Sequence, residues 1–265
     1  MTGRRWSLGF QLGVTLLACA FLITPAILSI AAGVTVNYFR GLESGVTLKW
    51  VVQVWELYAD SIWLSLLIAV SCLACTLVIG VPAAYALAKN PGRLSRLIEE
   101  FVALPVAIPG LALALALLQV YGTMKGFRLS WTFILVGHVL YTLPFMIRSV
   151  MAIFAVIDLK TLEEGAATLG ASRWQRFRDI ALPSAVPGIL AGALTVVTLS
   201  IGEFNLTWML HTPITKTLPV GLADAYASMR LEIASAYTLI FFIMIAPLLM
   251  GMQMAAARAQ RVAGL

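Results

Sequence analysis

The sequence predicts an all-α, polytopic membrane protein with six transmembrane helices, and three observations lead to this fold class. The chain of 265 residues is 61% hydrophobic and only 11% charged, with a mean hydropathy of +0.94. Several apolar runs exceed the ~18 residues that fill a bilayer core. These runs lack the strict apolar and polar alternation of membrane β-strands, so the spans are expected to be helices.

Six apolar segments follow one another along the chain, at about 8–32, 62–88, 102–121, 132–156, 187–209 and 234–257. The first segment follows Arg4 and Arg5 and resembles a signal peptide in that respect. It is longer than the ~7 to 15 residues of a signal core and lacks a clear cleavage site before Pro25, so we interpret it as an anchor. Residues 1–265 are expected to form a single transmembrane domain, with an even span count that places both termini on one side.

The cysteines, prolines and histidine of the second, third and fourth segments allow more than one interpretation. Pro105 and Pro109 each remove a backbone donor, so the third span should bend or unwind, either to frame a cavity or as a simple kink. His138, alone on an apolar helix, is better explained by a core hydrogen bond than by a functional role. Cys72 and Cys75 lack a second ligand pair, so no metal site and no disulfide is expected.

The distribution of basic residues predicts the orientation, because cytoplasmic loops of membrane proteins carry an excess of lysine and arginine. With the N-terminus inside, twelve of the 18 basic residues lie on the cytoplasmic side and six on the other. The six are Arg40, Lys49, Lys125, Arg128, Lys216 and Arg230. Both termini are therefore expected to be cytoplasmic in a multi-pass protein of the cell's inner membrane, and no nucleic-acid partner is expected.

The cytoplasmic segment of about residues 158–184 is expected to form two short helices at an angle. Thr161 and Glu164 have the spacing of a capping box, and Gly170 can take the left-handed conformation that ends a helix. Ser172 can cap a second helix, which Pro183 should end. Small residues on one side suit docking into a groove of another protein, whereas the arginines alone would also suit a plain loop bound to anionic lipid.

This segment resembles the Glu-Ala-Ala loop of permease subunits in binding-protein-dependent ABC importers. The match runs from Glu164-Gly165-Ala166 through Gly170 to Ile180-Ala181-Leu182-Pro183, with Gly165 in place of the usual alanine. The Leu104-Pro105 to Pro109-Gly110 pattern and the six spans extend the resemblance to essentially the whole chain.

The resemblance implies that the segment docks in a cleft of a cytoplasmic ATP-binding subunit. The residues expected at this contact are Glu163, Glu164, Gly165, Ala166, Ala167, Gly170, Ala171 and Ser172. It also implies a second permease subunit, identical or different, and an extracytoplasmic solute-binding protein, all assembled at the lipid bilayer. The sequence has no Gly-x-x-x-x-Gly-Lys-Ser/Thr loop, so ATP hydrolysis would come from the partner.

Polar side chains in the fifth apolar segment are the candidates for a translocation path. On a continuous helix Ser200, Glu203 and Thr207 share one face. A carboxylate facing lipid costs ~2.5 kcal/mol or more, so Glu203 should face the bundle interior or water. It would then line the path, or hold the bundle together through hydrogen bonds; the sequence leaves both open.

The function predicted from these features is that of a permease subunit in an ATP-driven importer of a small polar solute. The alternative is a secondary transporter driven by an ion gradient, with Glu203 carrying a proton. An intramembrane enzyme is not expected, because we find no paired aspartates, no Ser/His pair and no His-Glu-x-x-His in the spans, and we expect no catalytic residue and no cofactor. The stretches Gly202-Glu203-Phe204 and Thr217-Leu218-Pro219-Val220 resemble permeases for 2-aminoethylphosphonate, polyamines and ferric iron. An acidic path residue favours a cargo with an amine, such as an aminophosphonate or a polyamine.

Overall fold

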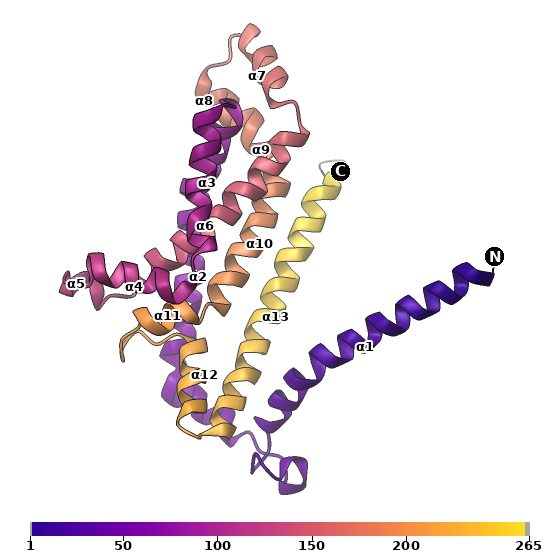
Figure 1. Ribbon diagram of the computed structural model, residues 1–265, viewed down its shortest axis with the longest axis vertical. Coiled ribbons are helices and arrows are strands. Elements are labelled where there is room, and N and C mark those ends of the chain that lie inside the picture. Colours follow the sequence, from indigo (N-terminus) through magenta and orange to yellow (C-terminus); the bar gives the residue numbers. More distant parts are fainter. Residues whose placement is uncertain (1, 263–265) are drawn as a thin grey trace. The chain divides into compact units, whose positions relative to one another are not determined.

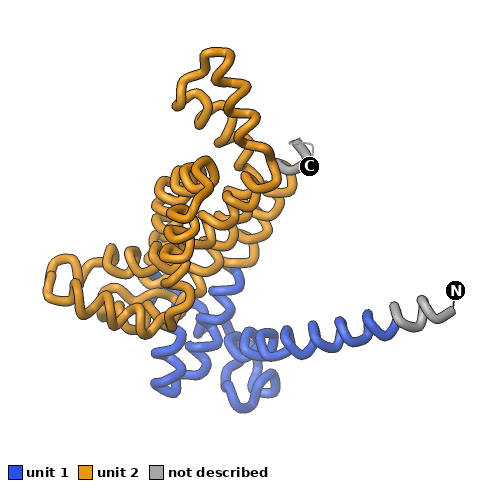
Figure 2. The backbone as a smooth tube through the Cα atoms, turned by 45° about the horizontal axis from the view of Figure 1, so that its top comes forward, with its two compact units in different colours: residues 1–59, 221–243 blue, residues 60–220, 244–265 orange. Residues whose placement is uncertain are grey.

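The computed structural model describes the backbone of residues 2–262 and the side chains of residues 9–258. The regular elements of these residues are helices, and an isolated antiparallel bridge joins Thr35 to Val46, so the all-α prediction is confirmed. The chain divides into two compact units (Figure 2). Unit 1 contains residues 1–59 and 221–243, and unit 2 contains residues 60–220 and 244–265.

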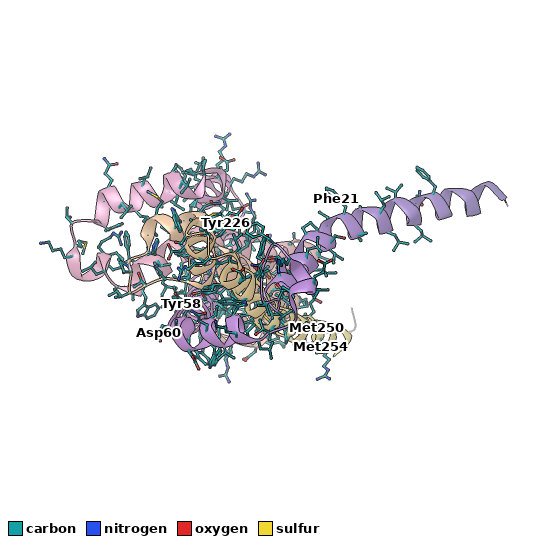
Figure 3. The ribbon with its side chains drawn as sticks, turned by 90° about the horizontal axis from the view of Figure 1, so that it is seen from below. Phe21, Tyr58, Asp60, Tyr226, Met250 and Met254 are labelled. Atoms are coloured by element: carbon teal, nitrogen blue, oxygen red, sulfur yellow. The ribbon has the colours of Figure 1, made fainter. Side chains whose placement is uncertain are left out.

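Unit 1 begins with the long apolar helix α1 (Thr2–Ala32), followed by η1 (Gly41–Ser44). It also holds the first part of α2 (Lys49–Lys89), most of α12 (Leu218–Ala227) and the first part of α13 (Leu231–Val262). The most apolar stretch of α1 has no buried residue, and Phe21 is one of the side chains that project from it (Figure 3). Such an apolar, exposed surface is expected of a helix that faces lipid or another membrane subunit.

Unit 2 is built around α6 (Trp131–Val156) and α10 (Val186–Gly202), which lie side by side (Figure 1). Glycine allows this close approach, because a Cβ on Gly188 would lie 2.6 Å from the backbone oxygen of Ser149. Met146, Val150 and Val196 form part of the buried core between these helices. The remaining elements of the unit are α3 (Arg93–Ala107), α4 (Gly110–Tyr121), α5 (Lys125–Arg128), α7 (Leu159–Thr168), α8 (Arg173–Arg176), η2 (Phe177–Ala181), α9 (Leu182–Ser184) and α11 (Asn205–Leu210).

Four helices of the described residues are long and apolar enough to cross a membrane, and the count is six if each of two bent pairs is one span. The four lie at 9–32, 49–89, 131–156 and 231–258, and the bent pairs are 93–107 with 110–121 and 173–184 with 186–202. Three predicted spans therefore correspond to longer helices, since α1, α2 and α13 continue into polar sequence that hydropathy alone assigns to loops. The fourth predicted span, 132–156, agrees with α6 to one residue.

The predicted third span, 102–121, is bent, and its helical part begins nine residues earlier than expected. Helix α3 begins at Arg93 and ends at Ala107, and α4 starts at Gly110 with a bend of 103° between them. The bend that the prolines predicted is confirmed. It falls at Ile108 (ψ 131°), because the residue before Pro109 is forced out of the helical region, whereas Pro105 stays inside α3.

Two further predictions of secondary structure are also corrected. The predicted fifth span, 187–209, breaks after Gly202, where Glu203 takes an extended backbone (ψ 119°), and resumes as the short helix α11. The sequence between the first and second predicted spans and between the fifth and sixth is also not all loop, because it contains the start of α2 and all of α12.

Candidate functional sites: a capped hairpin and a broken helix

The segment of residues 159–184, called the hairpin below, begins with α7 at one end of unit 2 (Figure 1). Asp158 caps α7, because its carboxylate accepts hydrogen bonds from the backbone N–H (3.2 Å) and the hydroxyl (2.6 Å) of Thr161. These bonds lower the pKa of Asp158. The predicted capping box at Thr161 is therefore wrong: the helix starts two residues earlier, and Glu164 pairs with Lys160 (3.8 Å) instead.

A turn at Gly170 joins the two parts of the hairpin, as predicted. Gly170 has φ +83°, in the left-handed region that glycine occupies without strain. Ser172 then caps α8 with a complete capping box: its hydroxyl accepts from the N–H of Gln175 (3.3 Å), and the Gln175 side chain accepts from the N–H of Ser172 (2.7 Å).

The second half of the hairpin does not end at Pro183 as predicted. Helical backbone continues through η2, a π-helical turn, and α9, and the direction changes by 67° at Ala185 before α10. Pro183 therefore lies within this helical backbone, where the π-helical turn η2 meets α9.

Most residues predicted to contact an ATPase lie on the outside of the hairpin. Glu164, Gly165, Ala167, Gly170 and Ser172 are exposed, and Ala166 and Ala171 are half-buried. Apart from chain neighbours and the nearby backbone of α7, nothing in the described part of the chain lies within 4 Å of a Cβ built on Gly165 or Gly170. The hairpin therefore presents an open surface of small residues.

Glu163 is the exception, because it is 4% exposed and faces inward. Its carboxylate lies 2.5 Å from Nζ of Lys89 and 3.7 Å from Nη1 of Arg176, and it accepts a hydrogen bond from the hydroxyl of Tyr85. Burial by itself would raise the pKa of Glu163. The hydrogen bonds from Lys89 and Tyr85 and the charges of Lys89 and Arg176 outweigh it and lower the pKa.

The second site surrounds the break between α10 and α11. Glu203 is half-buried, and its carboxylate accepts hydrogen bonds from the backbone N–H of Leu206 (3.1 Å) and from the N–H (3.0 Å) and hydroxyl (3.1 Å) of Thr207. These backbone donors are the free N–H groups at the start of α11, so Glu203 acts as the cap of this helix. At the other end of α11, Nη1 of Arg128 donates to the carbonyl of Leu210 (2.8 Å).

His138 of α6 connects the two helices on either side of the break. It is 1% exposed; Nδ1 lies 2.9 Å from Oγ of Ser200 in α10, and Nε2 lies 2.8 Å from Oγ1 of Thr207 in α11. The single hydroxyl hydrogen of Thr207 is directed to Glu203, so Nε2 carries the hydrogen that Thr207 accepts. Ser200 then donates to Nδ1. The interpretation of His138 as a hydrogen-bonded core residue is confirmed, whereas the expectation that the spans hold no Ser/His pair is wrong, because the fold brings Ser200 to His138 from 62 residues away.

The three predicted path residues are brought together, but not on one continuous helical face. Ser200 is 4% exposed and Thr207 is 0% exposed, and each is bonded to His138, which the sequence did not connect to them. The sequence did contain a signal for the break. Gly202 is followed by Glu203, a possible helix cap that lies three residues before Leu206.

Apolar helices long enough to cross a membrane, two of the possible spans being bent, are typical of multi-pass transport subunits. The chain belongs to the family of binding-protein-dependent transport system inner membrane components, which matches residues 76–262. It is accordingly a permease subunit of an ABC importer in the inner membrane. This assignment agrees with the resemblance seen in the Glu164 to Pro183 motif.

Several curated proteins are similar to the chain. It is 31% identical over 180 residues to the molybdenum transport system permease protein ModB of Haemophilus influenzae, covering 62% of this chain and 77% of that protein. A probable molybdenum ABC transporter permease of Haloferax volcanii is 30% identical, with 86% and 84% covered. The putative 2-aminoethylphosphonate permease PhnV of Salmonella typhimurium is 26% identical, with 92% of each chain covered.

Solved structures share the fold. A chain of a bacterial ABC transporter involved in the import of the acidic polysaccharide alginate matches with a TM-score of 0.74 at 18% identity, covering 96% of both chains. A chain of the inward-facing MetNI methionine transporter matches with a TM-score of 0.64 at 20% identity, covering 80% of this chain and 97% of that chain.

Proposed function

We propose that this chain forms half of the translocation path of an importer for a small tetrahedral oxyanion, of the molybdate or phosphonate type. The observation that carries this proposal is the chemistry shared by the named relatives. Molybdenum permeases are 30% and 31% identical to the chain, and a 2-aminoethylphosphonate permease covers 92% of it. Molybdate and the phosphonate group are both tetrahedral and anionic.

The hydrogen bonds of Glu203 argue against the polyamine alternative. The polyamine cargo was favoured because an acidic residue in the path would suit an amine, whereas both oxygens of Glu203 already accept hydrogen bonds from α11. We therefore assign Ser200, Glu203 and Thr207 a structural role at the helix break, in which they fix the wall of the path.

Uptake by the complete transporter tests the cargo. The permease pair, ATPase and solute-binding protein are reconstituted in vesicles, and uptake of molybdate, 2-aminoethylphosphonate and putrescine is compared with and without ATP at the ATPase side. We expect ATP-dependent uptake of one oxyanion and none of putrescine. Uptake of putrescine alone would contradict the proposal, and gradient-driven uptake without ATP would favour the secondary transporter.

The hairpin is proposed to be the ATPase-docking element, with Glu164, Gly165, Ala166, Ala167, Gly170, Ala171 and Ser172 at the contact. The open surface of small residues supports it. Gly170→Trp should leave the permease inserted but reduce copurification of the ATPase and abolish uptake. Gly126→Trp, on the equally open α5, is the control and should retain both. Normal ATPase association of Gly170→Trp would contradict docking.

Thiol labelling on the two sides of the membrane tests the proposed cytoplasmic position of both termini. Cysteine introduced at Lys49 or Lys216, in a background without the native cysteines, should react with an impermeant thiol reagent from outside. Cysteine at Arg173 should react only after permeabilisation. Labelling of Arg173→Cys from outside would overturn the orientation.

A further inference from the structure

Four side chains from three helices meet where the hairpin approaches the end of α2. Glu163 of α7 contacts Lys89 and Tyr85 of α2 and Arg176 of α8. Lys89 also donates to the hydroxyl of Tyr85 (3.1 Å) and lies 5.2 Å from the centre of its ring. A single carboxylate of α7 thus connects this arm of the hairpin to α2 and to α8 in the other arm.

The burial of this cluster makes the loss of the Glu163 charge costly. The side chains of Glu163 and Arg176 are 6% and 17% exposed, and that of Lys89 is 33% exposed. Arg176 pairs with Glu163 through Nη1 at 3.7 Å, while its buried Nε has no hydrogen-bond partner among the described residues. Without Glu163, two cations would face each other across a partly dehydrated space, which disfavours the arrangement strongly.

Aromatic packing beneath the ion pairs joins the same elements. The ring of Tyr85 lies 5.0 Å from that of Phe177 in η2 and 6.3 Å from that of Phe154 in α6. Leu87 and Leu159 belong to the core that continues from this point. The hairpin is therefore attached to α2 by both charge and packing, unlike a loose connecting loop.

We propose that Glu163 is the positioning residue that makes the hairpin and the end of α2 move as one body. Its neighbour Glu164 faces the opposite way, with a side chain that is 67% exposed and paired only locally with Lys160. The two adjacent carboxylates thus have different roles, because Glu164 lies on the surface offered to the ATPase, whereas Glu163 transmits the displacement of that surface to a transmembrane helix. This inference rests on the proposed docking of the hairpin.

The test separates transmission from docking by measuring cargo transported per ATP hydrolysed in the reconstituted complex. In Glu163→Gln the outer surface is unchanged, so the ATPase should copurify at the wild-type level while the transport-to-ATP ratio falls at least fivefold. Glu100→Gln, an exposed carboxylate of α3, is the matched control and should keep the wild-type ratio. Tyr85→Phe removes one hydroxyl only and should lower the ratio about twofold.

A double-mutant cycle provides the second measurement. If Glu163 acts through Lys89, the ratio of Glu163→Gln/Lys89→Gln should be no lower than that of Glu163→Gln alone. A wild-type ratio in both Glu163→Gln and Tyr85→Phe overturns the proposal, as does loss of ATPase copurification in Glu163→Gln, since the residue would then act in docking. The proposed docking of the hairpin is tested separately, because normal ATPase association of Gly170→Trp would contradict it.

Discussion

The hairpin and the break between α10 and α11 each hold one carboxylate away from bulk water, and they satisfy it with different donors. At the hairpin, Glu163 meets two cations and a phenol from other helices. At the break, Glu203 meets two backbone N–H groups and one hydroxyl of the helix that follows it. The difference follows the surroundings, because a lysine or arginine is costly to bring into an apolar span, whereas the start of a helix supplies donors without adding a charge.

This contrast predicts which carboxylate depends on its charge and which depends on its shape. Glu163 compensates the positive charges of Lys89 and Arg176, so an amide at this position should not replace its role. Glu203 mainly accepts hydrogen bonds, so an amide should replace much of its role. The predictions below test this difference, from the largest expected effect to the smallest.

Glu203→Leu should have the largest effect, because it leaves the N–H groups of Leu206 and Thr207 and the Thr207 hydroxyl without this acceptor. Each unsatisfied group costs about 1–3 kcal/mol, so we expect a loss of about 3 kcal/mol in stability. The measurement is the melting temperature of the purified complex in detergent. Glu203→Gln, which keeps an acceptor oxygen, should melt within a few degrees of the wild type and transport normally. Strongly reduced uptake by a stable Glu203→Gln complex would instead place this charge in the path.

His138→Leu should have the next largest effect, about 2 kcal/mol, because Ser200 and Thr207 both lose a buried partner. The other histidine supplies a matched control: His211 is half-buried and bonds only to the carbonyl of Trp208 near it in sequence (2.8 Å), so His211→Leu should change the melting temperature little. A cycle with Thr207→Val should show non-additivity. Equal melting temperatures for the two histidine variants would remove His138 as the link across the break.

The contribution of Glu163 to stability should depend on pH. Its pKa is lowered in the folded protein, so its ionised form stabilises the fold at pH values above the ordinary glutamate pKa, and this contribution is lost as the pH falls through the lowered pKa. The wild type should therefore melt above Glu163→Gln at pH 7, and the two curves should converge on acidification below about pH 4. A difference that persists unchanged in acid would mean that shape, and not charge, matters at this position.

The sequence predicted the fold class and the features with local signals. Hydropathy gave the fourth span almost to the residue, Pro109 predicted the break after α3, and Gly170 and Ser172 predicted the turn and cap of the hairpin. Each of these depends on residues within one or two turns of the chain.

The remainder depends on contacts between distant segments. The cluster around Glu163 joins residues 74 apart in the case of Lys89, and the bonds of His138 span 62 and 69 residues. No proline marks the break at Glu203. The Gly202-Glu203 pair is a weak local signal, and the bonds from α6 and α11 show why the helix ends there.

The smallest predicted effects compare two glycines of the hairpin that differ only in backbone conformation. Both have open space where a Cβ would be, but Gly165 lies inside α7, whereas Gly170 has φ +83°. Gly165→Ala should stabilise the hairpin by up to about 1 kcal/mol, since alanine favours helix. Gly170→Ala should destabilise it by about 1 kcal/mol, because an L side chain is strained in the left-handed region. Melting curves of the two complexes should therefore shift in opposite directions. ATPase copurification should stay normal in Gly165→Ala, since the added methyl group is no larger than those of Ala166 and Ala167 beside it. Loss of the ATPase there would mean that the partner approaches the backbone of α7 more closely than the hairpin surface indicates.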